Sequence, residues 1–182
     1  MKRFIQSISD EYLLGSLELV EEVFTDSEGA ESGKLVRSVV EEIRSKKYYL
    51  PELELLMLDE NNSVIGYAMF SRFHLEGKYD DRLLLLSPVA VKTRLQRQHI
   101  SKELIEYGFE KARELGYEAV LVEGDPRNYN PRGFVTSCDY GIVASPKVKL
   151  PAPECLMVKE LTPGALDNIK GEVDFSYYES LS

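Results

Sequence analysis

An apolar run, Leu83-Leu-Leu-Leu-Ser-Pro-Val-Ala-Val91, precedes a polar loop, Arg94-Leu-Gln-Arg-Gln-His99, and then a helical pattern over Ile100–Leu115. The run has the length of a strand, and Pro88, which cannot donate a ladder hydrogen bond, predicts a bulge or a splayed end there. Gly116 ends the helix. The buried side of this helix is predicted from residues at three- and four-residue spacing, namely Leu104, Ile105, Tyr107, Phe109, Ala112 and Leu115.

Four further strands are predicted around this stretch. Ala119–Val122 follows the helix closely enough for a strand–helix–strand crossover with parallel pairing. Leu53–Leu58 and Val64–Phe73 form a hairpin across the turn residues Asp59–Ser63. Cys155–Leu161 is a last strand, and it follows a loop that contains several prolines.

The N-terminal part of the chain predicts a strand and two helices. Lys2–Ile8 alternates as an opening strand does, and Ser9 and Asp10 offer N-cap side chains to the first helix. The polar residues Asp26–Gly33 separate that helix from the second. The apolar positions are Leu13, Leu17, Val20 and Phe24 in the first helix, and Leu35, Val36, Val39, Val40 and Ile43 in the second. The order of elements indicates one mixed α/β domain over residues 1–182.

Composition excludes more functions than it identifies. The chain has 182 residues and a formal charge of −9, which disfavours nucleic acid as a partner because phosphate binding usually needs a basic surface. Two cysteines, Cys138 and Cys155, and two histidines make a disulfide framework or a metal site improbable. Neither a membrane helix nor a signal peptide is recognisable, so we expect a cytoplasmic protein with no membrane partner.

Three motifs flank the central helix. Leu86-Ser-Pro-Val-Ala-Val91 and Gln96-Arg-Gln-His-Ile-Ser101 precede it, and Glu123-Gly-Asp-Pro-Arg-Asn-Tyr-Asn-Pro-Arg-Gly-Phe134 follows it. With the order of elements, they resemble the cofactor-binding core of the GNAT N-acetyltransferase superfamily. The Gly-Asp-Pro and Tyr-x-x-x-Gly-Phe pattern is similar to that of a bacterial subgroup of these enzymes. The likeness runs from about Leu35 to about Val173.

The resemblance implies both a fold and a reaction. The fold would be α/β (α+β), with a mixed, mostly antiparallel central sheet, helices on both faces and the GNAT-like acyl-CoA N-acyltransferase architecture. The reaction would move an acetyl group from the cosubstrate acetyl-CoA to a primary amine by direct attack in a ternary complex. The acceptor, a small molecule or a peptide, is not identified by the sequence, and a homodimer is left open.

The resemblance also implies where the cofactor binds. In this family a splayed strand exposes backbone groups to the pantetheine arm, and the pyrophosphate lies at a helix N-terminus, where the helix dipole favours an anion. The corresponding residues here are Val89, Ala90, Val91, Gln96, Arg97, Gln98, His99, Ile100, Ser101 and Asn128.

The pyrophosphate loop departs from the family pattern. The usual motif is Gln/Arg-x-x-Gly-x-Gly/Ala, in which glycine lets the backbone approach the phosphates. Gln96 matches, but His99 and Ser101 occupy the two glycine positions, and Arg97 stands where the subgroup often has glycine. If His99 adopts the required backbone geometry, the amides remain available and its neighbours can contact phosphate. If its side chain fills the cradle, affinity falls.

The catalytic candidates are one tyrosine and several carboxylates. Tyr129, in the Tyr-x-x-x-Gly-Phe pattern, is implied by the resemblance to protonate the departing thiolate, and a phenol is mostly protonated at neutral pH. Glu123 is a candidate base for the amine, as is Asp125, for which we favour a turn-stabilising role. Glu54 and Glu76 are candidates by position only.

Two alternatives stay open. A degenerate relative could keep the fold and bind a ligand or a partner without transferring anything, and the altered Gln96–Ser101 loop motivates this hypothesis. The intact pattern from Tyr129 to Phe134 argues against it. An enzyme that uses a longer acyl-CoA is the second alternative, because the sequence does not show the pocket volume.

Overall fold

The computed structural model describes residues 1–176 and 178–181. They divide into two compact units. Unit 1 consists of Met1–Phe70 and Ser87–Lys111, and unit 2 consists of Ser71–Leu86 and Ala112–Ser182. The single domain expected over residues 1–182 stays a prediction.

Unit 1 holds the predicted hairpin and the three long helices. Its elements in chain order are β1 (Arg3–Ser7), α1 (Leu13–Glu28), α2 (Ala30–Arg44), β2 (Glu54–Asp59), β3 (Val64–Arg72) and α3 (Ile100–Glu114). The last residues of β3 and α3 belong to unit 2. Strand β2 pairs antiparallel with both β1 and β3. The predicted strand, helix and hairpin order is thus confirmed for this part of the chain.

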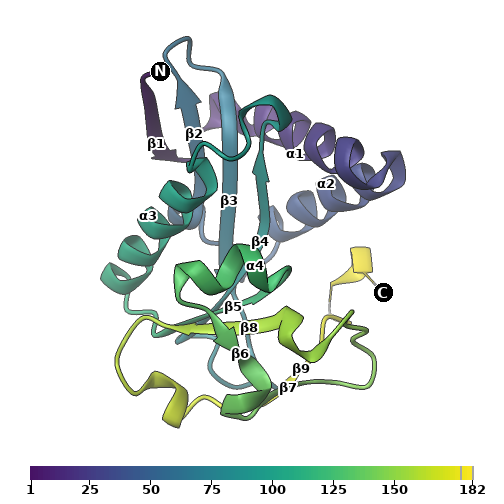
Figure 1. Ribbon diagram of the computed structural model, residues 1–182, viewed down its shortest axis with the longest axis vertical. Coiled ribbons are helices and arrows are strands. Elements are labelled where there is room, and N and C mark those ends of the chain that lie inside the picture. Colours follow the sequence, from purple (N-terminus) through teal and green to yellow (C-terminus); the bar gives the residue numbers. More distant parts are fainter. Residues whose placement is uncertain (177, 182) are drawn as a thin grey trace. The chain divides into compact units, whose positions relative to one another are not determined.

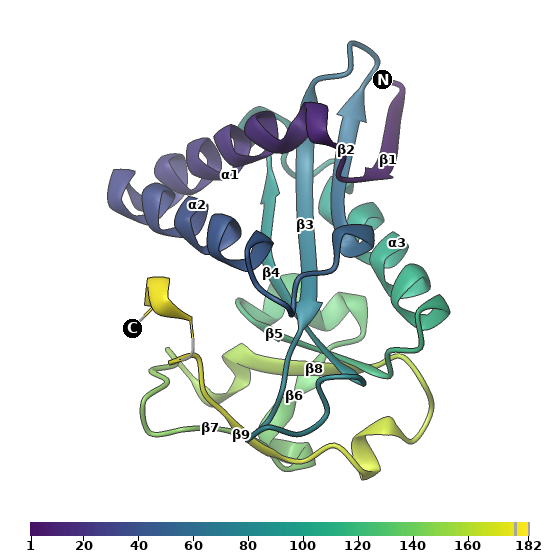
Figure 2. The same ribbon diagram turned by 180° about the vertical axis from the view of Figure 1, so that it is seen from behind.

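The helices of unit 1 cover both faces of its strands. On one face, Gly66 of β3 lies so close to α3 that a Cβ would come 2.7 Å from Ile100 Cγ2. On the other face, Arg44 of α2 reaches the buried Glu54 of β2. In Figure 1 α3 lies in front of the strands, and in Figure 2 α1 and α2 do. A helix on each face buries both sides of β2 and β3, which explains their continuous apolar character.

Unit 2 is built on strands that come from distant parts of the chain. Besides the start of β4 (Leu83–Val91), its elements are β5 (Ala119–Glu123), α4 (Pro126–Tyr129), β6 (Val135–Thr136), β7 (Ile142–Ala144), β8 (Leu156–Glu160) and β9 (Gly171–Val173). Strand β5 pairs parallel with β4, as the crossover predicts, and antiparallel with β8. A separate pair of strands, β7 and β9, is parallel.

The hydrogen-bonded order of the main sheet is β1-β2-β3-β4-β5-β8-β6. The pairings of β1 with β2, β2 with β3, β5 with β8 and β6 with β8 are antiparallel, whereas β4 with β5 is parallel. The sheet is therefore mixed and mostly antiparallel, and helices cover both faces of its unit 1 strands. The predicted fold class is confirmed.

Three local predictions were wrong. The break expected over Asp26–Gly33 is confined to Gly29, whose φ of 100° separates α1 from α2, because the polar residues on either side continue the helices on a solvent-facing side. Ser9 caps no long helix, since a 3-10 turn, Asp10–Tyr12, precedes α1. Leu115 is 46% exposed because α3 ends at Glu114, one residue earlier than predicted.

Candidate functional site

The second half of β4 lacks the pairing with β5 that its first half has, as the splayed end predicted at Pro88 requires, while β3 remains its other neighbour. The ladder between β4 and β5 covers Leu83–Leu85 among the described residues. The Ser87–Pro88 peptide bond is cis. Beyond it, Val89 is partly exposed, whereas Ala90 and Val91 are buried. Backbone groups that no neighbouring strand occupies can bind an extended ligand, as the pantetheine hypothesis for Val89–Val91 requires.

The loop between β4 and α3 keeps the backbone conformation of a glycine loop without containing glycine. Arg97 and His99 have φ values of 64° and 65°, in the left-handed region that glycine enters most easily. Ser101 lies inside α3 and needs no such conformation. Of the three replaced positions, only Arg97 and His99 therefore demand an unusual backbone. The side chains of Gln96–His99 are exposed, so they do not fill the loop from within.

Two contacts hold this loop from outside. Gln96 donates from Nε2 to the carbonyl of Val91 over 3.2 Å, which ties the loop back to β4. Arg3 of β1 donates to the carbonyl of Gln98 over 2.9 Å and pairs with Glu103 of α3. Sequence reasoning missed Arg3, because only the tertiary structure brings β1 to a loop 95 residues away.

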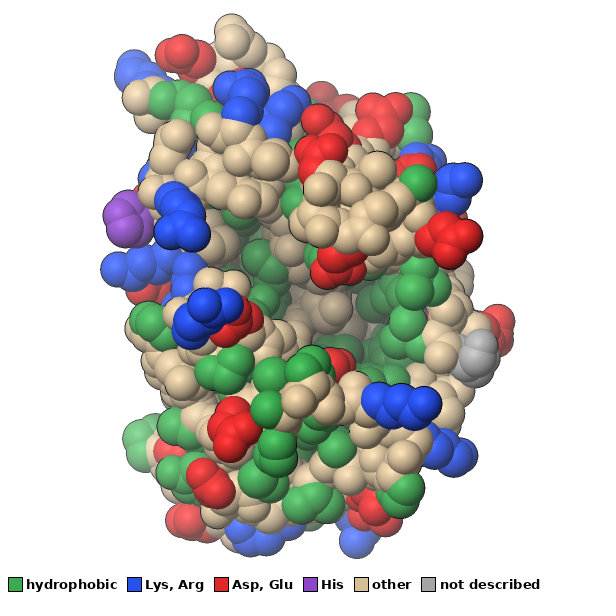
Figure 3. All heavy atoms as spheres, turned by 45° about the vertical axis from the view of Figure 1, so that its right-hand side comes forward, with side chains coloured by type: hydrophobic (Ala, Val, Ile, Leu, Met, Phe, Trp, Pro, Cys, Tyr) green, Lys and Arg blue, Asp and Glu red, His purple; other side chains and the backbone are tan. Residues whose placement is uncertain are grey.

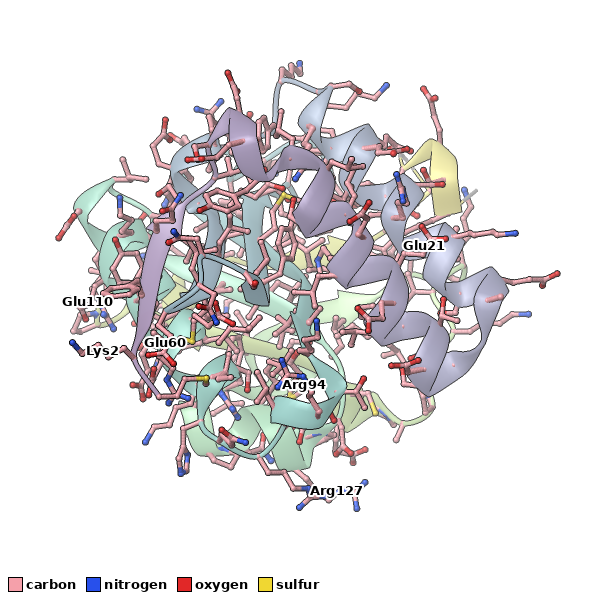
Figure 4. All side chains as sticks on the ribbon, turned by 90° about the horizontal axis from the view of Figure 1, so that it is seen from above. Lys2, Glu21, Glu60, Arg94, Glu110 and Arg127 are labelled. Atoms are coloured by element: carbon pink, nitrogen blue, oxygen red, sulfur yellow. The ribbon has the colours of Figure 1, made fainter. Side chains whose placement is uncertain are left out.

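A third contact joins the loop region to α1. Thr93, on the 3-10 turn Thr93–Leu95, donates to Asp26 near the end of α1 over 2.8 Å. Arg94 of the same turn is exposed and is labelled in Figure 4. Figure 3 shows basic and acidic side chains interspersed on one face of the molecule. The loop thus carries two arginines, Arg94 and Arg97, although the chain as a whole has a net charge of −9.

Replacing His99 by glycine is expected to stabilise the fold. A left-handed conformation costs a non-glycine residue about 1–2 kcal/mol, and the larger entropy of glycine in the unfolded chain offsets part of the relief. We expect a net gain of about 0.5–1 kcal/mol in the free energy of unfolding, measured by urea denaturation. Lys102→Gly, inside α3, is the control and should lose about 1 kcal/mol. Destabilisation by His99→Gly would show that the imidazole makes contacts that outweigh the strain.

In unit 2 the residue after Glu123 lies against the ring of Tyr129. Glu123 is the last residue of β5, and the next residue, Gly124, donates its amide to the carbonyl of Cys155 over 2.9 Å. A Cβ on Gly124 would lie 2.5 Å from Cε2 of Tyr129, so the aromatic ring rests on this glycine. The end of β5 and the ring of Tyr129 are consequently in contact.

The surroundings of these two side chains change their proton affinities. Partial burial raises the pKa of the Glu123 carboxyl, although the side chain keeps solvent contact. Burial also raises the pKa of the Tyr129 phenol, and the positive charge of Arg132 opposes this effect. Both groups therefore hold a proton more readily than an exposed carboxyl or phenol does.

The turn after β5 is held by Asp125. Its carboxylate accepts the amide of Arg127 over 2.9 Å as the N-cap of α4, and it pairs with the guanidinium of the same residue. This pairing lowers the pKa of Asp125. The structural role that we favoured for Asp125 is confirmed. Tyr129 ends α4, and Phe134 packs against it edge-on, with the ring centroids 5.6 Å apart.

The two further carboxylates differ in their surroundings. Glu54 is fully buried, and its carboxylate accepts hydrogen bonds from Arg44, Tyr49 and Tyr67, so its lone pairs are engaged inside unit 1. Glu76, in unit 2, accepts the amide of Glu172 over 3.4 Å. Glu54 and Asp125 are thus engaged in ion pairs, whereas Glu123 has a pKa that partial burial raises.

Proteins of known name or structure resemble this chain over most of its length. The Escherichia coli (strain K12) protein named uncharacterized N-acetyltransferase YjhQ is 30% identical over 146 residues, which cover 79% of this chain and 78% of that protein. YhbS of the same strain, also named an uncharacterized N-acetyltransferase, is 29% identical over 124 residues, 68% of this chain and 71% of YhbS.

Solved structures share the fold. The crystal structure of Escherichia coli YhbS in complex with CoA has a TM-score of 0.83 at 24% identity and covers 94% of this chain and 88% of that one. A GNAT family acetyltransferase from Brucella melitensis, in complex with acetyl-CoA, has a TM-score of 0.73 at 20% identity, with 100% and 99% coverage. No helix among the described residues has both the length and the hydropathy needed to span a membrane.

The family model of the acetyltransferase (GNAT) family matches residues 18–140, which include most of α1, all of α2 to α4, the loop after β4, Glu123 and Tyr129. This match covers more than half of the chain, and it includes the segments from which the resemblance was inferred. The chain belongs to the acetyltransferase (GNAT) family.

Proposed function

We propose that this protein transfers an acetyl group from acetyl-CoA to a primary amine by direct attack in a ternary complex. The observation that best supports the proposal is the left-handed backbone of Arg97 and His99 before α3. It retains the shape that glycine gives to a pyrophosphate loop, although the glycines are absent. The complexes of YhbS with CoA and of the Brucella melitensis protein with acetyl-CoA support the choice of cosubstrate.

Cofactor binding would use backbone groups more than side chains. The amides of the first turn of a helix lack acceptors within the helix, and the helix dipole favours an anion beside them. The Gln96–Ser101 loop and the start of α3 would hold the pyrophosphate in this way, with Arg97 adding a charged donor. Val89–Val91 would bind the pantetheine arm through the backbone, and Asn128 is a further candidate contact.

The reaction needs a base for the amine and an acid for the thiolate. Glu123 would take a proton from the ammonium form of the acceptor, directly or through water, and the amine would attack the thioester carbonyl. As the carbon–sulfur bond breaks, Tyr129 would give its phenolic proton to the thiolate of coenzyme A. The raised pKa of Glu123 brings its proton affinity closer to that of an amine.

Calorimetric titration with acetyl-CoA and with coenzyme A tests the first step. We expect micromolar binding by the wild-type chain, and Arg97→Glu should weaken it by about tenfold or more, since a charge-assisted contact is replaced by repulsion. Arg94→Glu, in the neighbouring exposed turn, is the matched control for net charge. Equal weakening by both variants would indicate a general effect of charge rather than a contact at Arg97.

The pH dependence of kcat/KM tests the base. Glu123 acts only when deprotonated, so activity falls as pH drops through its pKa, which burial has raised. We expect the acid limb to lie above the ordinary range of a glutamate and to disappear in Glu123→Gln, with a loss of about 10²-fold in kcat. An unchanged acid limb in this variant would assign the proton transfer to another group.

A non-catalytic relative is the second candidate function. The observation in its favour is that exposed side chains, Arg97 and His99, stand at positions where the family pattern allows close approach of phosphate. This candidate predicts no binding of coenzyme A at millimolar concentration. Restoration of binding by His99→Gly together with Ser101→Gly would support it and contradict acetyl transfer by the natural chain.

A further inference from the structure

Arg3 of β1 reaches the backbone of the loop that precedes α3. Its Nη2 atom donates to the carbonyl of Gln98 over 2.9 Å and to the carboxylate of Glu103 over 2.6 Å, and its Nε atom donates to the same carboxylate over 3.2 Å. The planar fork of donors on a guanidinium makes such a set of bonds possible. Arg3 therefore holds both the peptide unit between Gln98 and His99 and the first turn of α3.

His99 lies between two peptide units that are both held. Its own carbonyl accepts the amide of Glu103 over 3.0 Å, a bond that belongs to the start of α3. The peptide unit on its other side carries the carbonyl of Gln98, to which Arg3 donates. Because peptide units are planar, the orientations of the two that meet at a Cα set its φ and ψ. The two bonds together therefore keep His99 at φ 65°.

The conformation of His99 needs support from outside the loop. A left-handed backbone is unfavourable for a residue with a Cβ, whereas glycine adopts it freely. In a loop without glycine, the peptide unit before His99 gains by rotating away from this orientation. A donor fixed on β1 opposes that rotation, because the rotation would take the carbonyl of Gln98 away from Arg3.

The held peptide unit also has a free donor. In a trans peptide the carbonyl and the amide point in opposite directions. With the carbonyl of Gln98 turned toward Arg3, the amide of His99 is directed away from β1. Among the residues that the structure describes, this amide donates to no protein group. A hydrogen bond to the carbonyl polarises the peptide, which makes its amide a stronger donor.

Arg3 has a second effect, on the charge at the start of α3. Glu103 is the acidic residue of the first turn of this helix. Its carboxylate would repel an anion bound to the amides there and would compete with it for the helix dipole. The ion pair with Arg3 offsets this negative charge.

We propose that Arg3 is a positioning residue for cosubstrate binding, which orients the Gln98–His99 peptide unit so that the amide of His99 binds the pyrophosphate of acetyl-CoA. The inference rests on the proposed function. Arg3 does not touch the cosubstrate and takes no part in the chemical step. It supplies from β1 the support that a loop with left-handed residues and no glycine requires.

The first test compares the affinities of variants for acetyl-CoA by calorimetric titration. We expect Arg3→Gln to bind about tenfold more weakly, because a hydrogen bond to a charged group is lost. In an acetyl-transfer assay KM for acetyl-CoA should rise while kcat changes little. Arg3→Lys should recover part of the affinity, since an ammonium can donate to the carbonyl but lacks the planar fork. Lys2→Gln, at the exposed neighbour labelled in Figure 4, removes the same charge and should bind as the wild type does.

The second test needs no cosubstrate. At a positive φ the amide proton and the Hα of one residue lie close together, which gives a strong intraresidue NOE in the NMR spectrum. We expect this NOE for His99 in the wild-type chain and in Lys2→Gln. In Arg3→Gln it should weaken, because the peptide unit before His99 is no longer held.

Each outcome supports the inference or overturns it. Weaker binding and a weaker NOE in Arg3→Gln, with neither change in Lys2→Gln, support it. An unchanged NOE or an unchanged affinity in Arg3→Gln overturns it, and so does an equal loss of affinity in Lys2→Gln. If Arg3→Gln does not fold, Arg3→Met takes its place in both tests. If the wild-type chain binds no acetyl-CoA, the proposed function fails, and the NOE comparison alone decides whether Arg3 orients this peptide unit.

Discussion

Tyr129→Phe is expected to lower kcat by about 10²–10⁴-fold, the usual contribution of a general acid, while the affinity for acetyl-CoA changes little. The substitution removes one oxygen and keeps the ring, which rests on Gly124 and packs against Phe134. The turn should therefore survive, and the thiolate would have to leave without a proton. The measurement is release of coenzyme A from acetyl-CoA, followed by chromatography, with the best acceptor of an amine panel.

Two comparisons make this result specific. Tyr140→Phe, at a tyrosine that is 41% exposed in the same unit, should leave kcat unchanged. If Tyr129→Phe keeps the full kcat, as Tyr140→Phe should, then a group other than Tyr129 protonates the thiolate. A parallel loss of acetyl-CoA affinity in Tyr129→Phe would place the hydroxyl among the binding groups instead.

Glu54→Gln is expected to cost about 3–5 kcal/mol of stability, because it leaves the charge of Arg44 without its counter-ion inside unit 1. Glu54 is 0% exposed, and its carboxylate bonds to Arg44 over 2.9 Å and to Tyr49 over 2.6 Å, besides the bond from Tyr67. The hydrogen-bond donors and the packing of the network are arranged around an anion. Urea unfolding of the wild type and the variant measures the difference.

An exposed ion pair is the matched control for that network. Glu21 of α1, labelled in Figure 4, pairs with Arg37 of α2 over 2.8 Å, and both side chains are about one third exposed. Glu21→Gln should cost no more than about 1 kcal/mol.

The double variant Arg44→Met with Glu54→Gln should be less destabilised than the sum of its single variants, because neither charge is then left alone. Additive losses would show that the two residues stabilise the fold separately.

The same network shows why the fold was predictable in outline and not in this detail. The strand and helix order follows from hydrophobic periodicity, which is a local property of the sequence. Glu54 opens a strand and Arg44 ends a helix, and nothing in the spacing of these residues predicts that they pair. Arg44 also donates to the carbonyl of Leu13 and to Ser16, which joins α1 to the network. Such contacts depend on how α1, α2 and β2 pack.

The short elements of unit 2 were missed for a related reason. Strands β6, β7 and β9 have two or three residues each, too few to show an alternating pattern. Only hydrogen bonding to β8, or between β7 and β9, makes them strands. Helix α4 is similarly short. Asp125 caps its start and Pro126 is its first residue. In a sequence rich in turn residues, an Asp-Pro pair is equally typical of a loop, so the helix was not predicted.

By itself, the sequence determined the family pattern, the central strand–helix–strand unit and Tyr129 as the candidate acid, because motif spacing and periodicity are local. The tertiary structure decided that Arg97 and His99 have a left-handed backbone and that Glu54 is buried in a network. Backbone strain, burial and the field of a charge depend on contacts between residues that folding brings together, and residue order does not specify those contacts one by one.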